Sequence, residues 1–417
     1  MTTWEQAVDV VSGFLSDNAA SDPMGIAVSG GSDSLALLLI LKDWADGAGR
    51  SLHAVTVDHG LRPEAAEEAA FVAGLCADLT IDHTILRWDG PAPTGNISDQ
   101  ARQARYALMD AWAQDRGIDQ IAVGHTADDQ AETLLMRLGR GAGVDGLATM
   151  ATRRRIGQTD FLRPMLTLRR DALQDLLKQR GQTWINDPTN DNPDYDRVRI
   201  RQAMPTLSDI GLSVDALTTT AANLAQARDA LAHYAVQEAA KIVTQDAAGD
   251  ILIDHDAWTH LSAEIARRLI QAGLHHVAGP GYPPRSKALQ QLINHIHART
   301  PMTLAGCIVQ TDKTQIRITR EPAAVPGPVP ADHIWDTRWQ MTGPVPDGAE
   351  IAALTEGGLK ACPDWRDTGL KRTSLLSTPA IWLGDRLISA PIAGNLNGFQ
   401  AKLLRTRKDF DAALRTH

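Results

Sequence analysis

One short stretch near the start of the chain has the residue types and order of a phosphate-binding turn. It follows the apolar run 24–28 and precedes the apolar run 35–41, and it consists of Ser29, Gly30, Gly31, Ser32, Asp33 and Ser34. Glycines let a backbone approach an anion closely, and the amides at a helix N-terminus attract negative charge. No Gly-Lys-Ser/Thr follows, so the turn is not of the Walker type. Alone, it predicts nucleotide binding, with a ligand-free turn as the alternative.

A second polar group, residues 124–133, follows the apolar run 121–123 and opens a predicted helix. Asp129 and Glu132 are three residues apart and share a helix face, while His125 lies just before the expected capping box of Thr126 and Asp129. No cysteine or second histidine completes a zinc site. Next to a nucleotide, the carboxylates suit Mg²⁺ or a cationic substrate. The alternative is that they only stabilise the helix N-terminus.

The elements that position these groups alternate between strand and helix patterns. Apolar segments at 25–28, 52–57, 84–86 and 121–123 predict strands, with helical patterns between them. This rhythm predicts a parallel sheet covered on both faces, whose ligands bind beyond the carboxyl ends of the strands. The two polar groups and the segment 58–62 therefore meet at one edge. On the helix that begins after Thr126, we expect Leu134, Leu135 and Leu138, on the face opposite to the carboxylates, to supply core contacts.

The rest of the chain has a different pattern. Helical spacing predicts helices over 214–243, 263–277 and 285–298, and shorter strand-like pieces begin near Thr303. The four prolines in 322–330 predict a linker, and the turn-rich remainder predicts a small β-rich module. We assign its scattered tryptophans, Trp335, Trp339, Trp365 and Trp382, to a core rather than to base stacking.

Charge is distributed unevenly along the 417 residues, whose formal net charge is -9. Residues 133–205 hold 13 Lys and Arg against 8 Asp and Glu, whereas residues 1–132 hold 7 against 21. The arginines of this basic stretch, Arg137, Arg140, Arg153, Arg154, Arg155, Arg163, Arg169 and Arg170, suit phosphate contacts, with a solvated surface as the equal alternative.

The cysteines and the N-terminal residues indicate the cellular compartment in which the protein is expected. Cys76, Cys307 and Cys362 are odd in number and widely spaced, which argues against a disulfide framework. The sequence shows no signal-like start and no apolar run of membrane-spanning length. We expect a cytoplasmic protein with no membrane partner.

Eight motifs in order give the chain a specific resemblance. Besides the two polar groups they are 57–62, Ala101 to Tyr106, Arg140-Gly141, Gly146-Leu147, Arg163-Pro164-Met165-Leu166, and Asp187-Pro188-Thr189-Asn190 followed by Arg197. Together they resemble the tRNA(Ile)-lysidine synthetases of the PP-loop ATP pyrophosphatase superfamily. The match is dense over about residues 20–205.

The resemblance implies a two-step reaction on the wobble cytidine of the isoleucine tRNA with a CAU anticodon. ATP adenylates the oxygen on carbon 2 and releases pyrophosphate, and L-lysine then displaces AMP. The loop Ser29–Ser34 would bind ATP, Asp33 would hold Mg²⁺, and Arg105 would stabilise the polyphosphate charge.

The lysine ammonium would meet Asp129 and Glu132, with His125 next to the nucleotide or assisting proton transfer. Arg197 would reach back to the site. Two choices stay open, Arg105 against Arg102 and Arg197 against Arg199 or Arg201. A homodimer is left open by family analogy.

The expected architecture is an α/β PP-loop (Rossmann-like) catalytic domain over 1–205, a helical tRNA-binding domain over 206–300 and a small β-rich module over 301–417. Two rival functions remain. A tRNA thiolase would need a reactive cysteine at the active edge or a set of cysteines that binds a cluster. Neither is evident in the sequence, and Cys76 is the candidate for the first. A catalytically dead tRNA- or nucleotide-binding protein would not need Asp33, Asp129 and Glu132 together.

Overall fold

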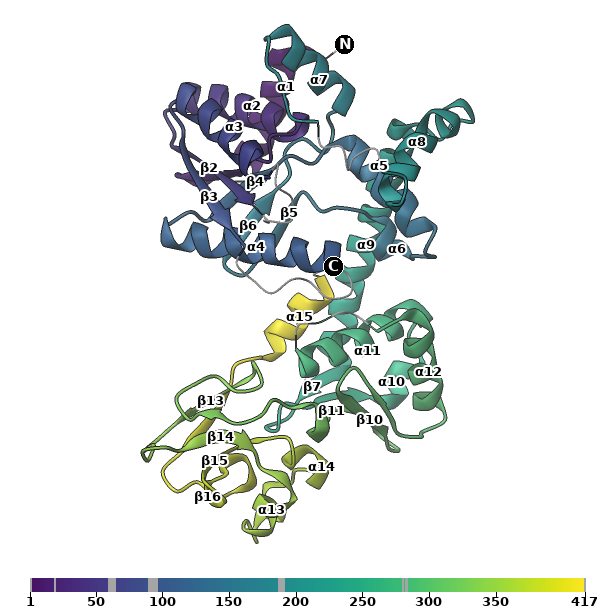
Figure 1. Cartoon of the computed structure of the whole chain (residues 1–417). Helices are drawn as coiled ribbons and strands as arrows, with labels where there is room; N and C mark the ends of the chain where they lie inside the picture. Colours follow the sequence, from purple (N-terminus) through teal and green to yellow (C-terminus); the bar gives the residue numbers. More distant parts are fainter. Residues whose placement is uncertain are drawn as a thin grey trace. The chain divides into compact units, whose positions relative to one another are not determined.

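The computed structural model describes residues 2–18, 20–58, 65–88, 97–186, 192–279, 281 and 284–415. It divides into two compact units, Met1–Arg228 and Asp229–His417 (Figure 1). The predicted motif residues 59–62 and 187–190 lie outside the described part. The predicted division of the chain at residues 205 and 300 stays a prediction.

A six-stranded sheet in the order β3-β2-β1-β4-β6-β5 forms the centre of the first unit. Every neighbouring pair is parallel except β5 with β6. The four predicted strands are present, and the hairpin of β5 and β6 extends the sheet beyond them. The strands are β1 Met24–Ala27, β2 Leu52–Asp58, β3 Asp82–Arg87, β4 Gln120–Val123, β5 Arg153–Ile156 and β6 Thr159–Leu162.

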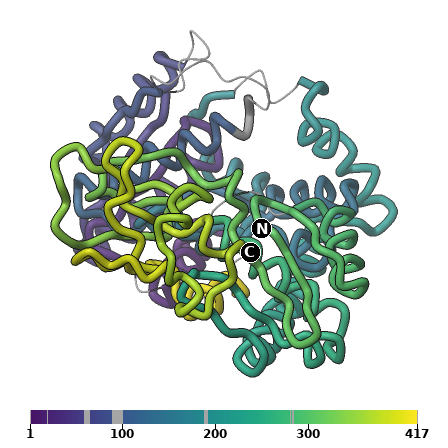
Figure 2. Tube along the Cα trace, turned by 90° about the horizontal axis from the view of Figure 1, so that it is seen from below, coloured from purple at the N-terminus to yellow at the C-terminus, as the bar shows by residue number. Residues whose placement is uncertain are grey.

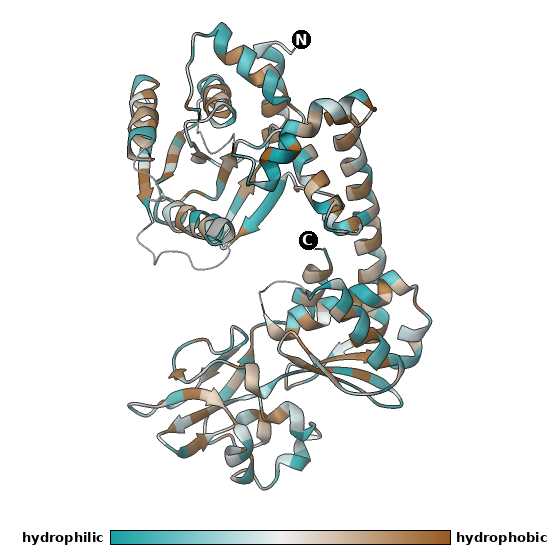
Figure 3. Ribbon diagram, turned by 45° about the vertical axis from the view of Figure 1, so that its right-hand side comes forward, coloured by the Kyte–Doolittle hydropathy of each residue, from teal (hydrophilic) through white to brown (hydrophobic). Residues whose placement is uncertain are grey.

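Helices cover both faces of this sheet, as the nearly continuous apolar strands predict. One face carries a core in which Val11, Leu38, Cys76 and Leu177 come from four different helices. On the other face Tyr106, Met109 and Trp112 of a single helix pack on the strands. Figure 3 shows the brown, hydrophobic bands along these strands. The helices are α1 Trp4–Asp17, α2 Ser32–Ala48, α3 Ala65–Asp78, α4 Ile97–Asp115 and α7 Arg170–Gln179.

Four further helices carry or flank the second polar group. Leu134 of α5 packs against Val214 and Leu217 at the start of α9. The prediction that Leu138 contacts the core is wrong. Leu138 is the last residue of α5, and it is 55% exposed. These elements are α5 Ala127–Leu138, α6 Val144–Leu147, α8 Asp196–Asp209 and α9 Val214–Ile242, the last of which continues across the division at Arg228.

The second unit combines helices with an antiparallel sheet in the order β7-β8-β11-β10-β9. The three predicted helices are present as α9, α11 and α12, but the sheet also takes two short strands, β7 and β8, from the stretch predicted as helical. Its core joins Trp258, Leu269 and Ile318 with Phe410 of the C-terminal helix. The elements are β7 Val243–Gln245, β8 Ile251–Asp254, α10 His255–Thr259, α11 Ala263–Ala278, α12 Ser286–His297, β9 Met302–Leu304, β10 Cys307–Thr311, β11 Gln315–Arg320 and α15 Arg407–Arg415.

The remainder of this unit is rich in short strands, as predicted, and its course can be followed from green to yellow in Figure 2. Trp335 and Trp339 are fully buried in its core, which confirms their predicted structural role. The proline-rich segment is partly ordered, since β12 pairs with β14. The elements are η2 Pro322–Ala324, β12 Val329–Pro330, β13 Trp339–Thr342, β14 Glu350–Ala353, α13 Thr355–Lys360, η3 Trp365–Thr368, α14 Arg372–Leu375, β15 Pro379–Leu383, β16 Arg386–Ser389, η4 Pro391–Ala393 and β17 Gln400–Leu403.

Gly124 brings the two polar groups together. It ends β4, and a Cβ built there would lie 2.9 Å from the backbone oxygen of Asp33 and 3.0 Å from the Cα of Ser34. Backbone atoms cannot yield as a flexible side chain does, so only glycine allows β4 to pass this close to the start of α2.

We expect Gly124→Ala to lower the free energy of unfolding by about 1–3 kcal/mol, because the added methyl group overpacks the contact. Urea denaturation followed by circular dichroism measures this. Gly13→Ala is the control, since Gly13 lies within α1 with nothing within 4 Å of the added Cβ. It should be neutral or stabilising by about 0.5–1 kcal/mol. Equal effects of the two substitutions would contradict the assigned contact.

Candidate functional site

The loop between β1 and α2 has the geometry of an anion-binding turn. Gly30 has a φ of 84°, a left-handed conformation that favours glycine. The Ser34 hydroxyl donates to the Gly31 carbonyl at 2.9 Å and accepts from the Ser29 amide at 3.1 Å, which fixes the curve of the loop. The start of α2 therefore directs its amides toward the carboxyl edge of the sheet.

Asp33, in the first turn of α2, faces the second polar group. Its carboxylate accepts from Nε of Arg170 at 2.8 Å, and the Ser32 hydroxyl donates to its other oxygen at 3.2 Å. Burial raises the pKa of the Asp33 carboxyl, and the charge of Arg170 opposes this shift. Asp33 and the second polar group thus share one cation.

The predicted capping box at the start of α5 is present. The Asp129 carboxylate accepts from the Thr126 amide at 2.9 Å and from the Thr126 hydroxyl at 3.0 Å. Its other oxygen pairs with Nη2 of Arg170 at 3.1 Å. Burial acts to raise the pKa of the Asp129 carboxyl, but the nearby charges of Arg170 and His125 hold it below its ordinary value. Asp129 therefore both caps α5 and presents negative charge to the site.

Glu132 is the most deeply buried of the acidic residues at the site, with 2% of its side chain exposed. Its carboxylate pairs with Arg170 Nη1 at 3.1 Å, Arg197 Nε at 3.2 Å and Arg201 Nε at 2.9 Å. Arg197 and Arg201 lie one turn apart on α8, whereas Arg199 pairs with Asp196. The structure thus brings Arg197 and Arg201 together at Glu132.

His125 lies buried before the capping box, and its Nδ1 has no hydrogen-bond partner among the described residues. Burial lowers the pKa of His125 to about 4. Asp129 opposes this shift, and Arg163, Arg102 and Arg197 reinforce it. The imidazole is therefore neutral near pH 7 and is available as a hydrogen-bond or proton acceptor.

The two arginines of α4 differ in their relation to the site. Arg102 and Arg105 are both exposed residues of α4, although the protein around the Arg105 guanidinium desolvates it enough to lower its pKa. The charge from α4 that acts on His125 is that of Arg102, whose guanidinium also lies over the Tyr106 ring. The role expected for Arg105 stays a prediction, and so does the choice between Arg105 and Arg102.

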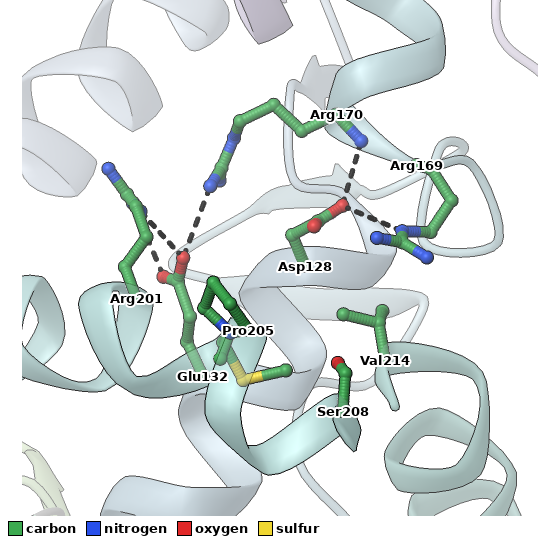
Figure 4. Close-up of a pocket in the computed structure, with 9 residues that line it drawn as sticks. Asp128, Glu132, Arg169, Arg170, Arg201, Pro205, Ser208 and Val214 are labelled. Carbon is green, nitrogen blue, oxygen red and sulfur yellow. Dashed lines mark hydrogen bonds and ion pairs between the residues drawn. The ribbon is translucent and has the colours of Figure 1, made fainter. Parts of the chain in front are cut away.

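A pocket of about 280 Å³ adjoins Glu132 (Figure 4). Asp128 accepts from the Arg170 amide at 2.7 Å and pairs with Arg169 Nε at 3.4 Å, and both contacts are drawn in Figure 4. The pocket thus has carboxylates and guanidinium groups on one side and apolar groups on the other. Its lining comprises Asp128, Glu132, Arg169, Arg170, Arg201, Met204, Pro205, Ser208 and Val214.

Sequence reasoning assigned Arg170 only to a general basic stretch, and it made Arg201 one of three alternatives. Part of that stretch serves the fold. Arg163 is buried and donates to the Ala151 carbonyl, while Arg153 pairs with Asp160. The signal for Arg170 was its place in the basic stretch, but its partners lie too far away in sequence to be inferred.

Among the described residues, no three histidine, cysteine or carboxylate side chains are grouped so that they could hold a metal ion. No helix in the described part of the chain is long and apolar enough to cross a membrane. The donors near the phosphate loop are carboxylate oxygens, which suit a hard cation such as Mg²⁺. A magnesium ion there would take one or two carboxylates and complete its shell with nucleotide phosphates and water.

Comparison with known proteins agrees with this geometry. The sequence profile of the PP-loop domain matches residues 6–207, so the first unit carries an ATP-binding PP-loop domain. Two relatives extend the similarity beyond that domain. The tRNA(Ile)-lysidine synthase of Ruegeria pomeroyi is 42% identical over 99% of both chains, and that of Hyphomonas neptunium is 36% identical over 77% of this chain and 88% of its own. The chain belongs to the tRNA(Ile)-lysidine synthase family.

Among solved structures, the U34-tRNA thiolase NcsA from Methanococcus maripaludis with its [4Fe-4S] cluster has a TM-score of 0.47 and 16% identity. The match covers 53% of this chain and 78% of that chain.

We expect the ring of His125 to remain neutral down to about pH 5, because burial penalises the imidazolium. Since the folded pKa lies below the ordinary value of 6.5, its contribution to stability is present above that pH and is lost as the pH falls toward about 4. NMR of the ring carbon resonances against pH measures this, with His125→Asn used for assignment. A midpoint near 6.5 would contradict the buried neutral state.

Proposed function

We propose that this protein joins L-lysine to carbon 2 of the wobble cytidine in the isoleucine tRNA with a CAU anticodon, and that it consumes ATP and releases AMP and pyrophosphate. Membership of the lysidine synthase family supports the reaction. The observation that carries it is the meeting of the phosphate loop at Asp33 with the buried carboxylates Asp129 and Glu132 around one cation.

The first step places negative charge on a leaving polyphosphate. The cytidine oxygen on carbon 2 attacks the α-phosphorus of ATP, and the bond to the β-phosphate oxygen breaks. The amides at the start of α2, with the hydroxyls of residues 29–34, would bind these phosphates. Asp33 lies in this turn and would hold Mg²⁺ together with the phosphates, where the ion would neutralise developing charge.

In the second step, the ε-ammonium group of L-lysine must be held in place and must lose a proton before it can attack. The ε-nitrogen of lysine attacks carbon 2, the bond from carbon 2 to the adenylated oxygen breaks, and the amine loses its protons. Asp129 and Glu132 would locate the ammonium by charge, and neutral His125 has a free acceptor nitrogen to bind the nucleotide or assist proton transfer. Met204 and Pro205 of the adjoining pocket suit the aliphatic part of lysine.

Exposed cationic groups on the edge strand of the sheet would contact the tRNA backbone. Arg154 and Arg155 on the edge strand β5 are exposed and suit phosphate oxygens. The proposed roles of Arg105 on the polyphosphate and of Arg197 at the site rest on the family resemblance. A homodimer and a cytoplasmic location remain predictions from the sequence.

The rival thiolase reaction lacks a suitable thiol among the described cysteines. Cys76 is fully buried in the core, and burial raises the pKa of its thiol to about 11. Cys307 and Cys362 are buried as well. A protonated thiol in a core is a poor nucleophile, so we favour lysine ligation.

Incubation with ATP, Mg²⁺, labelled L-lysine and a transcript of the CAU tRNA should incorporate the label and release AMP and pyrophosphate. Scintillation counting and chromatography measure both. Two controls, omission of ATP and replacement of the wobble cytidine by uridine, should abolish incorporation. Sulfur transfer without lysine incorporation would overturn the proposal.

Asp33 and Glu132 should affect different steps. Asp33→Asn should remove most pyrophosphate release, whereas Glu132→Gln should leave adenylated tRNA formation largely intact and raise the KM for lysine by about tenfold or more, the loss of one charge-assisted contact. Quench-flow assays of each step measure this. Asp171→Asn, an exposed change on α7, is the control. Equal loss of both steps in Glu132→Gln would contradict its assignment to lysine.

A further inference from the structure

Arg170 contacts the carboxylates that the proposed function assigns to Mg²⁺ and to L-lysine. Its guanidinium contacts Asp33 through Nε, Asp129 through Nη2 and Glu132 through Nη1, at 2.8, 3.1 and 3.1 Å. These partners come from α2 and α5, while Arg170 begins α7. Although burial acts to lower the pKa of Arg170, the three carboxylates raise it above its ordinary value, so the group stays charged.

The formal charges of this cluster balance in the absence of substrates. The three carboxylates of Asp33, Asp129 and Glu132 face the three guanidinium groups of Arg170, Arg197 and Arg201. The three carboxylates and the Arg170 guanidinium are 2–18% exposed, so an excess charge among them is costly, whereas the Arg197 and Arg201 side chains are 41% and 36% exposed. An ammonium group that enters this cluster therefore has to displace a guanidinium.

Arg170 is the guanidinium best placed to leave. In the described part of the chain, Arg197 and Arg201 reach Glu132 from α8, whereas Arg170 alone also pairs with Asp129 and Asp33. Asp33 belongs to the phosphate loop, so the Arg170 guanidinium contacts the loop that is proposed to bind the polyphosphate. Phosphate groups accept the guanidinium fork in the same bidentate manner as carboxylates and carry more charge.

We propose that Arg170 is an internal counterion that exchanges partners during the reaction. Without nucleotide it stands in for the lysine ammonium at Asp129 and Glu132. When ATP binds, its phosphates draw the guanidinium away, and the freed carboxylates accept L-lysine. Nucleotide binding thus precedes and strengthens lysine binding, and Arg170 acts as a positioning residue. The inference rests on the proposed function.

Isothermal titration of L-lysine into the full chain, with and without Mg²⁺ and the non-hydrolysable analogue AMPCPP, tests this order. For the wild type we expect lysine to bind at least about tenfold more tightly with the analogue, within the usual range of coupling between sites. Norleucine, which lacks the ε-ammonium group, should show no such gain.

Arg170→Gln should bind lysine more tightly than the wild type when no nucleotide is present, and the gain from AMPCPP should fall below about twofold. Arg170→Lys, which keeps a charge but not the three-way contact, should lie between the two. Arg180→Gln, near the other end of α7 and paired with Asp43, is the matched control and should behave as the wild type.

The proposal is overturned if AMPCPP does not strengthen lysine binding by the wild type, or if norleucine gains equally. It is also overturned if Arg170→Gln loses lysine affinity, the result expected of a purely structural ion pair. Should that variant fail to fold, Arg170→Lys and the wild-type comparison still decide. The incorporation assay separates the two failures, because a wild type that ligates lysine without nucleotide-strengthened binding refutes only the exchange.

Discussion

The ion-pair cluster around Glu132 is the constraint on which the catalytic edge of the first unit depends. A carboxylate with 2% exposure is costly unless cations compensate it, and Glu132 has three guanidinium partners. Those partners begin α7 or lie on α8, so charge compensation fixes where these helices meet α5. The same cluster includes Asp33 through Arg170, which ties the phosphate loop to the rest of the site.

The sheet provides the frame for this cluster. Parallel strands β1 and β4 are neighbours, so the turns that follow them lie side by side at one edge. Gly124 lets the second turn pass the backbone of Asp33, and the capping box then directs the Asp129 carboxylate to Arg170. Backbone dipoles at the start of α2 and buried carboxylates at the start of α5 thus give adjacent places of opposite electrostatic preference, one for phosphates and one for cations.

The sequence allowed prediction of the elements, of the site's acidic side and of Arg197 near it, but not of the central cation, Arg170. Strand and helix patterns near Ser29 and His125 are local, and the parallel arrangement brings them to one edge. The ion pair of Arg170 with Asp33 joins residues 137 positions apart, and no local pattern specifies such a contact. Likewise, the arginine run 153–155 does not reveal that Arg153 serves Asp160 within a hairpin. Strands β7 and β8 were missed because three or four residues carry too little periodicity.

A crystal structure of the full chain with AMPCPP, Mg²⁺ and L-lysine tests the central claim, exchange of cations at Asp129 and Glu132, most directly. The account predicts the Arg170 guanidinium at hydrogen-bonding distance, about 2.7–3.2 Å, from a phosphate oxygen, and the lysine ammonium on the two carboxylates. Arg170 still paired with all three carboxylates, with nucleotide and lysine both bound, would contradict it.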